Sequence, residues 1–155
     1  MTDHRHVHWI AAKHVLRYLH GKIGYGLRYT SVGGVRLSGY TNSDWANSAV
    51  DRKSTSGYCF SMGSAMISWS SRKQSSVALS TAKAEYIAAS DVGEEAIWLR
   101  KLLAGLFGDV LETTVIQCNN QSCVKLSKNL VFHDRSKHIE MWYHYLRDMV
   151  QKGAI

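Results

Sequence analysis

The chain has 155 residues and a formal net charge of +7, with 45% hydrophobic and 10% aromatic residues. This length and composition fit one folded domain with a buried core and exclude a disordered tail. No stretch approaches the roughly 20 apolar residues of a membrane helix, and the N-terminus has no apolar signal segment. We therefore expect a cytoplasmic protein, with the nucleus as the alternative, whose basic surface attracts phosphate backbones.

Hydrophobic periodicity and turn residues predict an α/β fold. The expected elements are, in chain order, a helix over residues 8–20, strands over 26–31, 35–42, 57–62 and 65–71, a helix over 81–106, a strand over 114–118, and helices over 121–126 and 139–150. Ser80 is well suited to cap the long helix. The order implies a mixed sheet, in which three antiparallel strands are followed by a crossover helix and a further strand, with helices packed on the sheet.

The cysteines and tryptophans are expected to be structural. Three cysteines are an odd number and lie in predicted strands or helices, which indicates reduced thiols rather than disulfides. They are Cys59, Cys118 and Cys123. Three tryptophans within apolar segments are predicted to be core residues rather than platforms for stacked bases. They are Trp45, Trp69 and Trp98.

Six segments carry the most specific signal in the chain. They are GYTNSDWANS (39–48), RKSTSGYCF (52–60), ISWSSRKQ (67–74), STAKAEYIA (80–88), CNNQSC (118–123) and HDRSKHIEMWYH (133–144). In this order they resemble the ribonuclease H domain at the end of copia-type retrotransposon polyproteins. The resemblance implies a ribonuclease H-like domain over residues 32–155, without the family's last strand and helix. Residues 1–31 are similar to the end of the reverse transcriptase that precedes it.

The family's chemistry depends on carboxylates that this chain partly lacks. Ribonuclease H domains hold two Mg²⁺ (or Mn²⁺) ions with four carboxylates and cleave the RNA strand of a duplex. The resemblance places these metal-binding positions at Asn42, Glu85 and Asn119, and the fourth beyond Ile155. Two of the family's aspartates are therefore neutral amides here, and amides are poor ligands for a hard cation.

Asp44 is a further candidate ligand. It lies two residues after Asn42, so an extended strand would place both side chains on the same face. Together with Glu85 it could hold one metal ion. In the alternative interpretation, Asp44 begins the following loop and is merely solvated.

Two groups of basic residues are candidates for contacts with nucleic-acid phosphates, with ordinary solvated charges as the alternative. The first group flanks the strands that bear the predicted site and comprises Arg52, Lys53, Arg72 and Lys73. The second group lies before the last predicted helix and comprises His133, Arg135, Lys137 and His138.

These features predict a metal-dependent endoribonuclease that acts on RNA/DNA hybrid or double-stranded RNA, with an antiviral or RNA-quality role. The alternative is a catalytically impaired, retrotransposon-derived module that binds such duplexes, and a third option is a fragment without function. Lys83 and Leu130 also stand where the family has other residues. We therefore interpret Asn42 and Asn119 as the result of mutational drift, and the alternative is that an experimenter replaced the two aspartates. Without the family's last strand, a sheet edge is expected to be exposed, and a homodimer would cover it.

Overall fold

The computed structural model describes residues 5–30, 36–108, 112–128 and 140–155. Its elements are α1 (His6–His20), β1 (Leu37–Asp44), β2 (Thr55–Met62), β3 (Ala65–Lys73), α2 (Thr81–Phe107), β4 (Val115–Cys118), α3 (Gln121–Lys128) and α4 (Glu140–Gln151). Apart from the strand predicted over residues 26–31, this α/β order is the one that the sequence predicts. Within the described ranges, none of the helices has the length and apolar character needed to cross a membrane.

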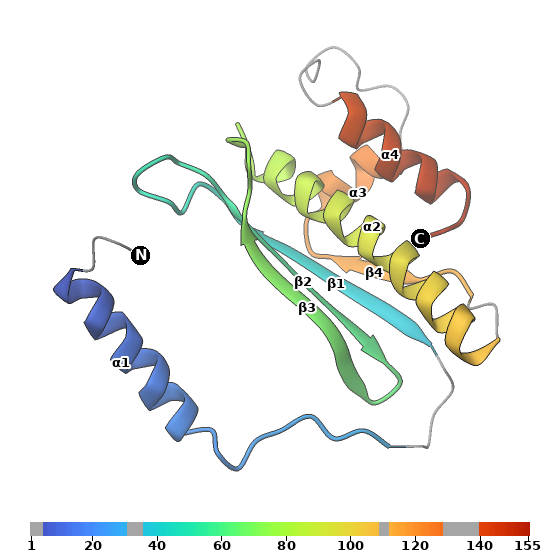
Figure 1. Cartoon of the computed structure of the whole chain (residues 1–155). Coiled ribbons are helices and arrows are strands. Elements are labelled where there is room, and N and C mark those ends of the chain that lie inside the picture. The colour runs from blue at the N-terminus through green and yellow to red at the C-terminus, as the bar shows by residue number, and fades with distance from the viewer. Residues whose placement is uncertain (1–4, 31–35, 109–111, 129–139) are drawn as a thin grey trace.

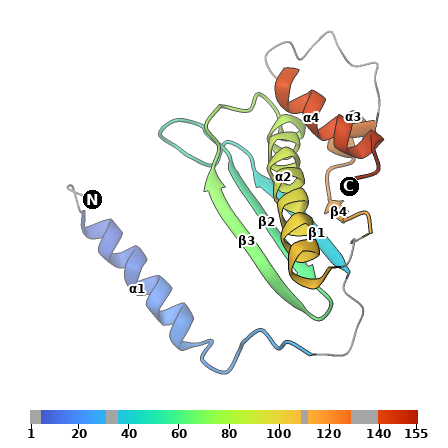
Figure 2. The same ribbon diagram turned by 45° about the vertical axis from the view of Figure 1, so that its right-hand side comes forward.

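The four strands form one mixed sheet in the order β3-β2-β1-β4. Antiparallel pairing joins β1 to β2 and β2 to β3, while β4 pairs with β1 in parallel. Figures 1 and 2 show α2 lying across one face of this sheet. In the sequence, α2 follows β3 and precedes β4. The predicted succession of three antiparallel strands, a crossover helix and a further strand is therefore confirmed.

The core lies between the sheet and α2. Phe60 from β2 and Val92 from α2 are fully buried and pack with Leu37, Leu99 and Leu103. The helix begins at the predicted cap, where the Ser80 hydroxyl accepts a hydrogen bond from the Lys83 backbone N–H at 3.2 Å. The cap and the apolar face together fix where α2 starts and which side of it faces the strands.

A second cluster joins the C-terminal part of the chain to α2. Tyr86 and Ala89 of α2 pack with Cys123 of α3 and with Leu146 and Met149 of α4. Helices α3 and α4 therefore lie beside α2 and next to the β4 edge of the sheet (Figure 1). This arrangement holds the end of β4 close to the first turns of α2.

The N-terminal segment differs from the prediction. Residues 26–30 do not form the predicted strand, and residue 31 lies outside the described residues. Instead, the Tyr29 hydroxyl donates to the Met66 carbonyl at 2.8 Å and the Thr30 N–H donates to the Ser64 hydroxyl at 3.2 Å. These isolated bonds attach the segment to the β2–β3 hairpin, whereas a strand needs a continuous ladder. Helix α1 buries none of its residues.

The prediction that three tryptophans belong to the core is wrong. Trp45, Trp69 and Trp98 are 45%, 67% and 55% exposed. Trp69 pairs with Cys59 in the sheet, one position from the pair of Phe60 with Ser68, so its ring lies on the face turned away from α2. The apolar character of a segment does not indicate which face of a strand or helix another element will cover.

Candidate functional site

The predicted site lies at the end of the sheet where β1 and β4 stop. These strands are parallel, and Thr41 lies opposite Cys118. Asn42 follows Thr41 within β1, and Asn119 follows Cys118 directly after β4, so each comes one position after this pair; both side chains are exposed. Adjacent strands are about 4.8 Å apart, so the two amides are neighbours at this end of the sheet.

Glu85 reaches the same end of the sheet from α2. Its side chain is buried, at 6% exposure, and Oε1 accepts a hydrogen bond from the Ser43 N–H at 3.0 Å. Ser43 directly follows Asn42, so this bond connects the first turns of α2 to the β1 position predicted to bind metal. The second oxygen, Oε2, is buried and has no hydrogen-bond partner among the described residues.

The environment of Glu85 disfavours its charge. Burial raises the pKa of this carboxyl, and the hydrogen bond from the Ser43 amide opposes the rise. A cation next to the unpartnered Oε2 would stabilise the ionised form. The group therefore has the properties of a buried ligand without a cationic partner among the described residues.

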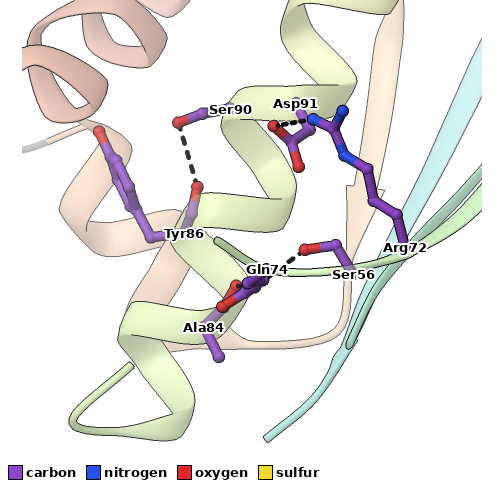
Figure 3. Close-up of polar contacts among 7 residues, drawn as sticks. All are labelled: Ser56, Arg72, Gln74, Ala84, Tyr86, Ser90 and Asp91. Atoms are coloured by element: carbon purple, nitrogen blue, oxygen red, sulfur yellow. Dashed lines mark hydrogen bonds and ion pairs between the residues drawn. The ribbon is translucent and has the colours of Figure 1, made fainter. Parts of the chain in front are cut away.

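Gln74 fixes the position of α2 relative to the strands, and the sequence analysis missed it. Its buried amide donates to the Ser56 hydroxyl at 2.8 Å and to the Ala84 carbonyl at 2.9 Å (Figure 3). Ala84 directly precedes Glu85, so Gln74 connects the site to β2 and to the chain that leaves β3. Its sole sequence signal is its place at the end of the segment over residues 67–74.

Asp44 is the last residue of β1, so the interpretation that it begins the following loop is wrong. It lies two positions after Asn42, with Ser43 between them, which places Asn42 and Asp44 on the same face of the strand. Its exposed carboxylate accepts a hydrogen bond from the Asn47 side-chain amide in the β1–β2 loop. In the part of the chain that the structure describes, no three His, Cys, Asp or Glu side chains gather to hold a metal.

These donors do not fit the two-ion site that the resemblance implies. Glu85 contributes one buried carboxylate with a free oxygen, whereas Asn42 and Asn119 contribute neutral amides. Mg²⁺ is strongly hydrated and requires anionic oxygens to replace its water. Compared with the site that the resemblance implies, these positions carry two fewer formal negative charges.

The first basic group lies at the same end of the sheet. Asp44 pairs with Thr55, and Thr55 pairs with Lys73, so the β1–β2 loop and the end of β3 adjoin the asparagines. Arg52 and Lys53 belong to this loop. Residues 133, 135, 137 and 138, which form the second predicted group, lie outside the described residues.

Two of the four basic residues are already paired with carboxylates. Arg72 Nη2 lies 2.8 Å from Asp91 Oδ1 of α2, as Figure 3 shows. Lys73 Nζ lies 2.8 Å from Asp51 Oδ2, and this hydrogen bond lowers the pKa of Asp51 well below its usual range. The sequence analysis did not predict these pairs, because their members are far apart in sequence or on different elements.

Arg52 and Lys53 keep a more available charge. Arg52 is exposed and has a left-handed backbone with φ of 54°. Lys53 is half-buried, and no ion pair within the described ranges involves either side chain. An incoming phosphate would meet these two charges without displacing a carboxylate.

All three cysteines are free, as the sequence predicts. Cys118 at the end of β4 and Cys123 in α3 share a cavity of about 200 Å³, which is also lined by Ala89, Ile116 and Leu146. Contact with the neighbouring Cys123 thiol lowers the pKa of Cys118 below its usual value. The same contact, together with burial, raises the pKa of Cys123.

Comparisons with known proteins point to mobile elements. No family model and no solved structure matches the chain. The retrovirus-related Pol polyprotein from transposon TNT 1-94 of Nicotiana tabacum is 46% identical over 148 residues, which are 96% of this chain and 11% of the polyprotein. The corresponding polyprotein from transposon RE2 of Arabidopsis thaliana is 40% identical over 96% of this chain and 10% of its own length.

A shorter relative is the secreted RxLR effector protein 161 of Plasmopara viticola. It is 48% identical over 92 residues, which are 59% of this chain and 65% of the effector. The match to the transposon polyproteins extends over nearly all of this chain, although the chain spans about a tenth of their length. The chain is therefore homologous to one segment of retrovirus-related Pol polyproteins from transposons.

Proposed function

We propose that this chain is a ribonuclease H-like domain that binds RNA-containing duplexes, and that Asn42 and Asn119 greatly weaken its metal-dependent cleavage. The observation that supports this proposal is that Asn42 and Asn119 come at the same end of the sheet, where the Ser43 N–H, next to Asn42, binds Glu85. These are the positions at which the resemblance implies metal-binding carboxylates. The homology to transposon Pol polyproteins supports the same origin.

The proposed ligand is an A-like duplex, either RNA/DNA hybrid or double-stranded RNA. Proteins recognise such helices by shape, phosphates and 2′-hydroxyls rather than by base edges. Arg52 and Lys53 belong to the loop that joins β1 to β2 at this end of the sheet, and they form no ion pair within the described ranges. They are the proposed phosphate contacts, and the charge of +7 favours the encounter with a polyanion.

Binding without efficient cleavage follows from the chemistry of the donors. In a complete site, paired Mg²⁺ ions activate the attacking water and stabilise the leaving oxygen. Here each asparagine removes one formal negative charge from the place where the ions would bind. What remains is Glu85, which can orient a cation through Oε2 and is itself held by the Ser43 amide.

An active endoribonuclease is the second candidate function. It is favoured by the buried, unpartnered Oε2 of Glu85 and by the exposed carboxylate of Asp44, which belongs to the same strand as Asn42. The two carboxylates would have to approach each other to give one divalent cation two anionic ligands. In this case cleavage would proceed slowly with the natural sequence.

The test compares the natural protein with the double variant Asn42→Asp/Asn119→Asp. Both proteins are assayed for binding and cleavage of RNA/DNA hybrid and double-stranded RNA, with Mg²⁺, with Mn²⁺ and with a chelator. We expect both to bind the RNA-containing duplexes and the double variant to bind Mg²⁺ more tightly. Its cleavage rate should rise on the order of 100-fold, or about 3 kcal/mol of transition-state stabilisation.

The matched control adds Glu85→Gln to the double variant, which should abolish the gain in cleavage while leaving the protein folded. Binding to a DNA duplex of the same sequence shows how much of the affinity depends on the A-like helix. Failure of the natural chain to bind any RNA-containing duplex would refute the proposed binding function. Efficient cleavage by the natural chain that survives Glu85→Gln would show that catalysis uses other residues.

A further inference from the structure

Two cysteine thiols meet where β4 turns into α3. Cys118 is the last residue of β4, and Cys123 is the third residue of α3. Cys118 packs against the cluster that contains Cys123, and both side chains line the same cavity. Asn120 holds the turn between them, because its side-chain oxygen accepts from the Cys123 N–H at 3.0 Å and its carbonyl accepts from the Val124 N–H at 3.1 Å.

Space and access at this place also suit a reaction between the thiols. Both cysteines line the cavity of about 200 Å³ between β4, α3 and α4. Cys118 is half-buried, whereas Cys123 is 2% exposed, so a reagent from solution meets Cys118 first. The apolar cavity wall, which includes Ile116 and Leu146, leaves room for the sulfurs to move.

The third cysteine of the chain is placed differently. Cys59 lies in β2 opposite Trp69 of β3, on the face of the sheet that is turned away from α2. Cys123, in contrast, belongs to the cluster that packs against α2. Cys59 is therefore a natural internal control, a half-exposed thiol without a thiol neighbour.

We propose that Cys118 and Cys123 are a redox-modification site that forms a reversible disulfide by exchange with a small disulfide of the glutathione class. The Cys118 sulfur attacks the small disulfide, whose S–S bond breaks, so that one thiol leaves and a mixed disulfide forms on Cys118. The Cys123 sulfur then attacks the Cys118 sulfur and displaces the second thiol. The protein loses two electrons and two protons, and the two released thiols carry them.

The bond would join the end of β4 to α3. The two sulfurs must approach to about 2 Å to form it. Asn119 directly follows Cys118, so oxidation would restrain one of the two asparagines at the end of the sheet. The chemistry of the thiols is independent of nucleic-acid binding, so it can be tested without a duplex.

The experiment treats the full chain with an excess of oxidised glutathione, alkylates the remaining thiols and analyses the peptides by mass spectrometry. We expect the peptide over residues 102–125, which holds both thiols, to lose the mass of two hydrogens and to take up no alkylating reagent. Cys59 should carry either a glutathione adduct or the reagent. Dithiothreitol should restore the labelling of both cysteines.

Two variants complete the design. Cys59→Ser should leave the result unchanged, and Cys123→Ala should convert the product at Cys118 into a persistent mixed disulfide with glutathione. Because the main measurement uses the natural protein, an unstable variant does not decide the outcome. Full alkylation of Cys118 and Cys123 under conditions that convert Cys59 to its adduct would overturn the proposal, as would a disulfide between Cys59 and Cys118.

Discussion

The Glu85 carboxylate is buried under the first turns of α2 and keeps one oxygen without a hydrogen-bond partner among the described residues. Its raised pKa means that the folded protein binds a proton at this group more readily than the unfolded chain does. The contribution of Glu85 to the free energy of unfolding therefore increases as the pH falls through the raised pKa. At neutral pH the ionised carboxylate destabilises the folded state. Such a cost is typical of groups kept for a ligand rather than for stability.

We predict that Glu85→Gln stabilises the protein at pH ~7 by on the order of 1 kcal/mol, because the amide retains the hydrogen bond from Ser43 and removes the buried charge. Urea unfolding at several pH values measures this difference. The gain should shrink in acid, where Glu85 is protonated in the folded state. Glu94→Gln, at an exposed position of the same helix, is the control and should change stability little. A gain that grows in acid would contradict the assignment.

At the scale of elements, the first turn of α2 has a capping residue but not a complete capping box. The Ser80 hydroxyl caps the helix through the Lys83 N–H, and Lys83 itself stands at the third helical position. A glutamate at that position would accept from the Ser80 N–H and would complement the positive end of the helix dipole. The lysine places a positive charge there instead.

We therefore predict that Lys83→Glu raises the stability of the protein by about 0.3–1 kcal/mol, read as a higher Tm in calorimetry. Lys101→Glu makes the same change in net charge near the other end of α2 and should give no such gain. Adding Ser80→Ala should cost about 1 kcal/mol and remove the benefit of a complete capping box. Equal gains from both lysine variants would mean that net charge, rather than capping, is responsible.

The packing of β1 against β2 depends on the absence of a side chain at Gly39. A Cβ there would lie 2.7 Å from the Phe60 ring, which is fully buried at the centre of the core. We predict that Gly39→Ala costs about 1–3 kcal/mol, because the ring is fixed between the sheet and α2. Gly57→Ala is the matched control in the neighbouring strand, where the nearest atom would be 3.8 Å away. Denaturant unfolding should show a lower free energy of unfolding for Gly39→Ala than for Gly57→Ala.

At the scale of the whole molecule, some basic side chains form ion pairs and others do not. Arg72 and Lys73 are paired with carboxylates, whereas no ion pair in the described ranges involves Arg52 or Lys53. Duplex affinity should decrease steeply with salt, because each phosphate contact releases counterions. Replacing Arg52 and Lys53 together by Ala should reduce the slope of log affinity against log salt by about 1–2 units. Replacing Arg72 and Lys73 should reduce it less, because Asp91 and Asp51 partly neutralise them.

Lys13→Ala/Arg17→Ala in α1 removes the same amount of charge at a site distant in sequence and serves as the control. Fluorescence anisotropy at several salt concentrations gives the slopes. A smaller effect of the Arg52/Lys53 pair than of this control would place the nucleic-acid interface elsewhere.

The N-terminal segment contributes little to the fold as a whole. Helix α1 has no buried residue, and two hydrogen bonds, from Tyr29 and Thr30, attach the following segment to the β2–β3 hairpin. We predict that deleting residues 1–21 changes the free energy of unfolding by less than about 1 kcal/mol. Urea unfolding of the shortened chain tests this, and a large loss of stability would show that α1 packs on the domain in solution.

The amino-acid sequence by itself predicted the order of the strands and helices from residue 35 onward and named the residues of the candidate site. Local rules sufficed for the strands that form the hairpin at Gly63 and for the cap at Ser80, because turns and caps depend on neighbouring residues. The six ordered segments placed Asn42, Glu85 and Asn119, and the parallel register of β1 and β4 brings the two asparagines to the same end of the sheet. The role of these residues stays a prediction.

Only the tertiary structure decided which side chains are covered and which charges are paired. Trp69 is exposed because α2 covers the other face of the sheet, and the segment before residue 31 does not join the sheet as a strand. The pairing of Arg72 with Asp91 and the bonds of Gln74 to β2 and α2 depend on how a helix and strands are brought together. Such contacts arise between residues distant in sequence, so no local pattern contains them.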